Sequence, residues 1–254
     1  MTDPLVRRVR AARRDDELAV LEGFHALKHA LRFGAEVEEA VAARPEELDR
    51  LAEELAPDLA GSLAGRARRV DAEVIAAMVP HAPHTGVVAI ARRPRVDVAA
   101  SLADPRPAPA VLLEDPRTMG NMGACVRVAA AADAAAVLTT GANDPWHPEA
   151  LRGAAGLHFA LPVARVEALP GGDRPLVAID PEGEVAAPGE LSPRSVLAFG
   201  TERYGLSEEL LGRADARLAI PMREGVSSLN LATAVAAVLF AMAKNTDATG
   251  RDSA

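Results

Sequence analysis

Hydrophobic and polar positions in the first hundred residues repeat with the periods of alternating helices and strands. Residues 16–33 place leucine, phenylalanine and alanine at three- and four-residue spacing and stop at Gly34, which predicts one helix. We then predict a strand over 37–43, a helix opened by Pro45 over 45–61, a strand turning into a helix over 68–80, and an apolar strand over 85–94. This pattern indicates a small α/β unit.

The second half is a series of short apolar runs that each end in a polar residue, glycine or proline. These runs cover residues 110–116, 134–141, 174–181, 195–202 and 216–222, and they alternate with helical stretches. That alternation is typical of a parallel sheet covered on both faces. Open sheets of this kind bind ligands at the carboxyl ends of their strands, and the polar residues of this chain gather there.

A proline-rich segment separates the two patterns. Prolines at positions 105, 107 and 109 remove backbone donors and favour extended chain. We therefore predict an α/β domain over 1–97, a linker over 98–109, a second α/β domain over 110–245 and a polar, frayed tail over 246–254.

Composition narrows the class of protein. The 254 residues are 49% hydrophobic, and no apolar run is long enough for a membrane helix. The amino terminus lacks the apolar core of a secretory signal. Cys125 is the single cysteine, so neither an internal disulfide nor a thiolate metal site is expected. We expect a cytoplasmic protein with no membrane and no metal partner.

Charge leaves two interpretations of the first half open. The formal net charge of -8 argues against binding nucleic acid by bulk attraction. Arginine clusters nevertheless occur at positions 7, 8, 10, 13 and 14, then 66, 68 and 69, then 92, 93 and 95. These arginines are either local contacts for RNA or solvated faces balanced by acidic stretches such as EVEEA and PEELDRLAEELAPD. Aromatic residues, at 3%, offer little material for stacking bases.

One candidate site segment, EDPRTMGNMGACVRVAAAA, joins an apolar strand to a helix over residues 114–132. Asn121 stands where a helix N-cap would, the glycines beside it allow close backbone approach, and Arg127 projects from the first or second helical turn. A capped helix with one exposed arginine is the plain alternative. The glycine spacing matches neither the dinucleotide fingerprint nor a phosphate loop.

A second candidate segment, LAFGTERYGLSEELL, follows another apolar strand. Gly200 comes directly after the strand, Glu202 stands at its tip, and Ser207 is placed to cap the next helix. The plain alternative for Glu202 is a solvated loop carboxylate.

The third candidate segment is LAIPMREGVSSLNLATAVAAVLFAMA. A strand end at Ile220 leads to a polar loop containing Ser228 and Asn230, which opens an almost wholly apolar helix. Such a helix belongs in a core or a subunit interface, and its polar start is a place for a ligand. Ser228 as a simple N-cap is the alternative.

Together, and in this order, the three segments resemble the motifs of the SpoU family of SPOUT methyltransferases, which transfer a methyl group from S-adenosylmethionine to a ribose 2'-hydroxyl of RNA. The resemblance covers the second half of the chain. More weakly, VLEGFHALKHAL and HTGVVAIA resemble the substrate-binding domain often attached to this family, an α/β unit like certain RNA-binding ribosomal proteins.

The resemblance implies a fold, a cofactor and a site. Its fold is a parallel sheet with a deep trefoil knot, which periodicity alone would never indicate. Its cofactor is S-adenosylmethionine, held by backbone around Gly200, Ile220 and Leu229. Its relatives are homodimers that share a site between subunits. The catalytic positions it implies are Asn121, Arg127, Glu202, Ser228 and Asn230.

Arg127 has two possible roles in that chemistry. Methyl transfer needs an aligned ribose hydroxyl and removal of its proton, and it needs no metal. A guanidinium stays protonated in proteins, which favours Arg127 as a clamp on the adjacent phosphate over Arg127 as a base. The resemblance thus predicts an RNA 2'-O-ribose methyltransferase acting on ribosomal RNA, with transfer RNA second. A catalytically quiet RNA-binding protein of this fold and a small-molecule α/β enzyme are the alternatives.

Overall fold

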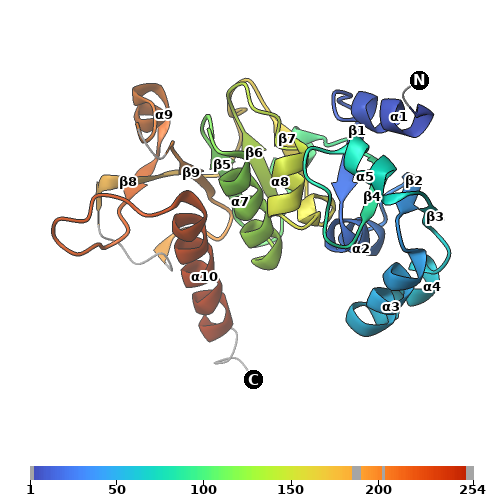
Figure 1. Cartoon of the computed structure of the whole chain (residues 1–254). Helices are drawn as coiled ribbons and strands as arrows, with labels where there is room; N and C mark the ends of the chain where they lie inside the picture. Colours follow the sequence, from blue (N-terminus) through green and yellow to red (C-terminus); the bar gives the residue numbers. More distant parts are fainter. Residues whose placement is uncertain (1–2, 185–189, 202–203, 250–254) are drawn as a thin grey trace. The chain divides into compact units, whose positions relative to one another are not determined.

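The computed structural model describes residues 3–184, 190–201 and 204–249 (Figure 1). Residue contacts divide the chain into two compact units. The first comprises Met1–Arg95 with Trp146–Ala160, and the second comprises Val96–Pro145 with Leu161–Ala254. Each unit contains one β-sheet, so the predicted α/β class is confirmed. The division differs from the predicted domains, because residues 146–160 group with the first unit and residues 98–109 with the second. The frayed tail predicted over 246–254 is also wrong at its start, since the helix Leu231–Thr249 continues into it.

The first unit is built on a four-stranded sheet with the order β1-β4-β2-β3. β4 runs antiparallel to both β1 and β2, and β3 is parallel to β2. The elements of this unit are α1 (Pro4–Ala12), β1 (Leu18–Glu22), α2 (Phe24–Arg32), β2 (Val37–Ala42), α3 (Pro45–Leu55), the 3-10 helix η1 (Pro57–Leu59), α4 (Ala60–Leu63), β3 (Arg68–Arg69), α5 (Ala72–Met78), β4 (Val87–Arg92), α8 (Pro148–Gly153) and the 3-10 helix η2 (Leu157–Phe159).

Residues 16–33 do not form the single helix that their spacing predicted. β1 occupies the first part, and α2 begins at Phe24 after Gly23, whose φ of +97° turns the chain. Four of the five β1 residues are buried. The prediction was wrong because a strand covered on both faces carries consecutive apolar residues, which spacing cannot distinguish from a helix.

Helix α1 was not predicted, although its sequence carries the signals of a helix. Asp3 caps it by accepting a hydrogen bond from the Leu5 N–H at 2.7 Å, and a proline occupies its first turn. Its buried face consists of Val6, Val9 and Ala12. The arginines between these positions concealed an ordinary amphipathic helix.

The second unit is built on a six-stranded sheet with the order β10-β8-β9-β5-β6-β7, and every pairing is parallel. The parallel sheet predicted from the apolar runs is confirmed. β7 is three residues long and was not predicted. The elements of this unit are α6 (Val98–Ala103), β5 (Ala110–Leu113), α7 (Met119–Ala131), β6 (Ala136–Thr139), β7 (Val163–Arg165), β8 (Leu176–Glu184), β9 (Val196–Phe199), α9 (Glu208–Arg213), β10 (Ala216–Leu218) and α10 (Leu231–Thr249).

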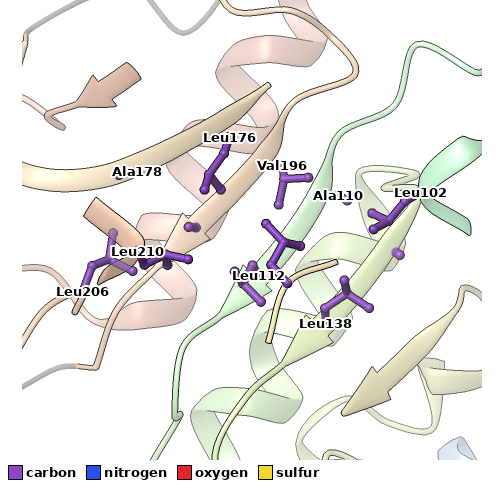
Figure 2. Close-up of a cluster of buried hydrophobic side chains, with 12 residues drawn as sticks. Leu102, Ala110, Leu112, Leu138, Leu176, Ala178, Val196, Leu206 and Leu210 are labelled. Carbon is purple, nitrogen blue, oxygen red and sulfur yellow. The ribbon is translucent and has the colours of Figure 1, made fainter. Parts of the chain in front are cut away.

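The central strands of the second unit are completely buried. Every residue of β5, β6 and β9 is buried. Figure 2 shows Leu112 of β5, Leu138 of β6 and Leu176 of β8 in one buried cluster that also includes Leu210 of α9. Strands buried on both faces leave their ends as the places where polar side chains reach solvent. Within the described ranges, no helix combines the length and apolarity needed to cross a membrane.

The segment 98–109 differs from the extended linker that its prolines predicted. It begins with α6, which Asp97 caps by accepting from the Ala100 N–H at 3.0 Å. The buried Arg174 donates to backbone carbonyls in the last turn of α6 and after it, including Leu102 at 2.5 Å and Ala108 at 2.7 Å. Burial lowers the pKa of Arg174, and these carbonyls satisfy its donors. The prolines follow the helix instead of preventing it.

Candidate functional site

A cavity of about 360 Å³ lies in the second unit beyond the end of β9 and beside the middle of β8. This volume is in the range of small-molecule sites. The described residues that line it come from three separate stretches of chain: Ile179, Asp180 and Pro181, then Phe199, Gly200, Thr201 and Gly205, then Ile220, Met222, Ser227, Ser228, Leu229, Leu231 and Ala234. The predicted cofactor-binding positions Gly200, Ile220 and Leu229 are all among them.

Gly200 allows a close backbone approach at one wall of the cavity. Thr201 and Gly205 exchange two backbone hydrogen bonds, at 3.1 and 3.0 Å, and so fold the chain back on itself. A Cβ atom at Gly200 would overlap the backbone of Gly205 and Leu206. Only glycine therefore suits this position, and the cavity wall here consists of backbone.

Asn121 and Asn230 are 109 positions apart in the chain and meet in the fold. The Asn230 side-chain amide donates to the Asn121 side-chain oxygen at 3.0 Å. Asn230 Oδ1 accepts from the Ala232 N–H at 3.0 Å and from the Thr233 N–H at 3.4 Å, so Asn230 caps α10. Two of the three candidate segments are thus joined by one side-chain bond beside the cavity-lining residue Leu231.

The caps differ from those predicted. α7 begins at Met119 after Thr118, so Asn121 lies in its first turn instead of at the N-cap. Asn230, not Ser228, caps α10, and Ser228 faces the cavity. Ser207 caps α9 as predicted, accepting from the Leu210 N–H at 3.2 Å. Asn121 is therefore left to contact another segment, and its amide meets Asn230 there.

Arg127 lies further along α7, away from the Asn121–Asn230 pair. It is exposed on α7 and is not among the residues that line the cavity. Six residues of α-helix place it about 9 Å along the axis from Asn121 and turn it by about 120°. It lies in the third helical turn, later than predicted, because α7 starts before Asn121.

Glu202 lies outside the described residues, so its catalytic role stays a prediction.

Asp180 lines the cavity and was not predicted from the sequence. Its carboxylate accepts from Arg217 at 3.0 Å and from the Glu182 N–H at 2.7 Å. Hydrogen bonding to Asp180 raises the pKa of Arg217. The signal was present, because Asp180 ends the apolar run at 174–181.

Cys125 is buried in α7, as expected for a packing residue. Among the residues that the structure describes, no three histidine, cysteine, aspartate or glutamate side chains lie together as metal ligands would.

The arginine clusters of the first unit are largely balanced by nearby glutamates. Arg8 pairs with Glu38 and Glu39 at 2.9 and 3.0 Å, and Arg92 pairs with Glu38 at 2.8 Å. Arg68 pairs with Glu39 at 3.3 Å. Glu38 and Glu39 belong to the EVEEA stretch, so the predicted balancing of arginines by this acidic stretch occurs at these pairs.

Comparison with known protein families agrees with this geometry. The SpoU rRNA Methylase family model matches residues 108–240, which include all three candidate segments. The model for RNA 2'-O ribose methyltransferase substrate binding matches residues 20–96, which all belong to the first unit except Val96.

Individual proteins give the same assignment. An uncharacterized tRNA/rRNA methyltransferase of Mycobacterium bovis is 33% identical over 207 residues, which is 76% of this chain and 70% of that protein. The structure of an AdoMet-bound rRNA methyltransferase from Sinorhizobium meliloti aligns with a TM-score of 0.73 at 26% identity, covering 96% of this chain and 95% of that one. The SpoU methyltransferase AviRb of Streptomyces viridochromogenes has the same fold, with a TM-score of 0.80 at 23% identity over 96% of this chain and 98% of that one.

Proposed function

The chain belongs to the SpoU rRNA methylase family, and from this premise we propose that it is an S-adenosylmethionine-dependent RNA 2'-O-ribose methyltransferase with ribosomal RNA as its substrate. The observation that carries the proposal is the joining of Asn121 to Asn230 beside a cavity walled by backbone at Gly200. Transfer RNA is the second candidate substrate. The RNA substrate implies a cytoplasmic location.

The cavity suits S-adenosylmethionine, which supplies the methyl group when bound. Its volume and its apolar lining by Ile179, Phe199 and Ile220 fit an adenine ring. The backbone at Gly200 and Leu229 would supply donors and acceptors without side-chain bulk. Asp180 and Ser228 offer polar atoms for the rest of the cofactor. We propose that the chain around this cavity forms the trefoil knot of the family.

The remaining residues would act on the RNA. Arg127 would bind the phosphate next to the target ribose and stabilise the developing alkoxide electrostatically. A guanidinium holds its proton, so this role is preferred to that of a base. Asn121, held by Asn230, would position the ribose or the arginine, and Glu202 would orient the arginine or the nucleotide. Ser228 would shape the pocket.

We propose that the active form is a homodimer. Arg127 does not line the cavity of its own chain, which is expected if it serves the partner's site. α10 packs against α7 and buries Val235 and Val238, yet Phe240 on the same helix is 45% exposed. Tyr204 and Val226 are also large exposed hydrophobic residues of this unit. We propose that these exposed apolar side chains form part of the subunit interface, because exposed apolar patches mark such interfaces.

RNA docking by the first unit is part of the proposal. It is supported by the substrate-binding family match over residues 20–96. The ion pairs of Arg8, Arg68 and Arg92 mean that RNA phosphates would compete with glutamates for these arginines. Binding there would therefore depend on the shape of the RNA as well as on charge.

The proposal is tested by transfer of labelled methyl groups from S-adenosylmethionine to deproteinised RNA from cells lacking this protein. Wild type should label one RNA size class at a nucleotide that resists alkaline cleavage. Arg127→Ala should lower kcat/KM by about a hundredfold or more, as loss of a charge-stabilising donor does. Arg106→Ala is the matched control, because Arg106 is an arginine of the same unit that precedes β5 and pairs with Asp104 and Asp133.

The possible results separate the candidate functions. Labelling lost with Arg127→Ala and kept with Arg106→Ala supports the enzyme. Measurable binding of cofactor and RNA without any labelling, including on RNA in assembling ribosomal particles, would favour the catalytically quiet RNA-binding protein. Binding of the cofactor with no affinity for structured RNA would favour a small-molecule enzyme.

A further inference from the structure

Two hydrogen bonds join the end of β5 to the start of α9. Glu114 directly follows β5, and Ser207 caps α9. The Ser207 N–H donates to Glu114 Oε2 at 2.7 Å, and the Ser207 hydroxyl donates to Glu114 Oε1 at 2.6 Å. Both bonds have the short lengths of bonds to an ionised carboxylate. The residues are 93 positions apart, so the contact belongs to the tertiary structure.

At its Ser207 end, the contact lies two residues from Gly205, which lines the cavity. The Glu114 N–H donates to the Phe199 carbonyl at 2.9 Å, so Glu114 also holds the end of β9, just before Gly200. Thr201 and Gly205 pair through their backbones, and both line the cavity. The Ser207 hydroxyl oxygen also caps α9.

At its Glu114 end, the contact adjoins the segment that carries Asn121. Only seven positions separate Glu114 from Asn121, and Asn121 is held to Asn230 at the start of α10. Glu114 thus links Ser207, two residues after the cavity-lining Gly205, to the strand end from which the Asn121 segment departs. Glu114 itself is not among the residues lining the cavity.

We propose that Glu114 is a positioning residue, whose carboxylate holds the cavity-lining backbone at Thr201 and Gly205 in the arrangement that binds the cofactor. The Ser207 N–H needs an acceptor, and the Ser207 hydroxyl, which already accepts from the Leu210 N–H, donates its proton to the second carboxylate oxygen. A carboxylate accepts both bonds with its charge, whereas the neutral amide of glutamine has one oxygen and can accept only one of these two bonds on a separate atom. That the ligand is S-adenosylmethionine rests on the proposed function, whereas the Glu114–Ser207 contact is independent of it.

The test compares wild type with Glu114→Gln, Ser207→Ala and the double variant. Titration calorimetry should show the Kd for S-adenosylmethionine rising about tenfold in Glu114→Gln, which corresponds to ~1.4 kcal/mol. RNA affinity measured without cofactor should not change. The double variant should lose much less than the sum of the single losses, because both changes remove the same contact. Glu167→Gln is the control, since Glu167 is an exposed glutamate of the same unit.

A second measurement needs no cofactor. Amide hydrogen exchange at Gly205, Ser207 and Leu210 should be faster in cofactor-free Glu114→Gln than in wild type, because the carboxylate no longer accepts both hydrogen bonds from Ser207. Ser207→Ala keeps a backbone donor and should show a smaller increase. If Glu114→Gln does not fold, Ser207→Ala provides both readouts, and a normal Kd with normal exchange in that variant counts against the proposal.

The outcomes distinguish this proposal from the proposed function. An unchanged Kd in Glu114→Gln, beside a wild type that binds S-adenosylmethionine, overturns the positioning role. A lower melting temperature with an unchanged Kd also overturns it, because Glu114 would then serve stability alone. A wild type that binds no S-adenosylmethionine, yet shows exchange protection that depends on Glu114, contradicts the proposed function and supports the Glu114–Ser207 contact.

Discussion

The two sheets of the molecule place their charged and polar side chains differently. In the first unit, β2 is only partly buried over its first half, and Glu38 and Glu39 there pair with arginines from neighbouring elements. In the second unit, β5, β6 and β9 are buried throughout, Thr139 is the single polar residue within these three strands, and the other polar side chains follow the strand ends. Glu114 and Gly200 are the first residues after β5 and β9.

The difference follows from how each sheet is covered. A strand with a solvated stretch can carry charges along its length, and these form ion pairs worth about 0–1 kcal/mol each. A parallel sheet covered on both faces leaves only its ends, so its polar residues converge on one edge. Convergence brings together segments that are distant in sequence, as the Asn121–Asn230 bond does. A binding site is therefore expected in the second unit.

The largest expected effect concerns Glu22, whose carboxylate is buried and is thus an exception to the solvated charges of the first unit. The side chain of Glu22 is only 2% exposed and is paired with Arg13 and with Arg152, the latter at 3.1 Å. Glu22→Ala should lower the free energy of unfolding by about 3 kcal/mol, because it leaves two arginines without their partner. Chemical denaturation measures this. Glu53→Ala, which changes an exposed glutamate of α3, should alter stability little, and equal losses would contradict the special role of Glu22.

The next effect concerns the backbone wall in the second unit. Gly200→Ala should weaken S-adenosylmethionine binding by about a hundredfold, or ~2.7 kcal/mol, because the added Cβ would overlap the backbone of Gly205 and Leu206. Calorimetric titration measures the loss. Gly212→Ala is the matched control, since a Cβ at this α9 position meets no atom within 4 Å. Equal affinity in both variants would show that the wall does not bind the cofactor.

A smaller effect is expected from the surface arginines of the first unit. Replacing Arg66, Arg68 and Arg69 together by alanine should weaken RNA binding several-fold, because each phosphate contact adds a modest, salt-dependent term. The effect is limited because Arg68 is paired with Glu39 and Arg69 with Glu46. Filter binding at two salt concentrations measures it, and cofactor affinity should stay constant. An unchanged RNA affinity would place the RNA elsewhere on the unit.

The smallest effect is a pH dependence of the first unit. Burial lowers the pKa of His29 below its ordinary value of 6.5, and nearby cations such as Lys28 and Arg32 add to this. The hydrogen bond to the Ala155 carbonyl, at 2.7 Å, opposes the shift. Because the folded pKa is the lower one, this contribution to stability is present above about pH 6.5 and is lost as the pH falls further.

Urea unfolding at pH 7.5 and pH 5.5 measures this dependence. Wild type should lose more stability between these two values than His29→Gln, which cannot take up the proton. The two proteins would lose the same amount if the pKa of His29 were equal in the folded and unfolded chain.

Much of the fold could be predicted from the sequence where local signals agreed with packing. The five apolar runs of the second unit correspond to β5, β6, β8, β9 and β10. Pro45 opens α3, and Ser207 caps α9. Prediction failed at β1, where burial on both faces removed the alternation of a strand, and at α1, where arginines concealed an amphipathic face. In both cases the deciding contacts came from elements distant in sequence.

The sequence by itself determined the chemistry available to this protein. It specified the glycine, asparagine and serine residues at strand ends, the backbone freedom at Gly200 and the apolar character of α10, because these depend on residue type and local order. Only the tertiary structure decided which of them meet. Parallel pairing sets the carboxyl ends of β5 and β9 side by side, so that Glu114 meets Ser207, and the packing of α10 on α7 joins Asn230 to Asn121. Such contacts depend on chain topology across about a hundred residues, and no local pattern records that distance.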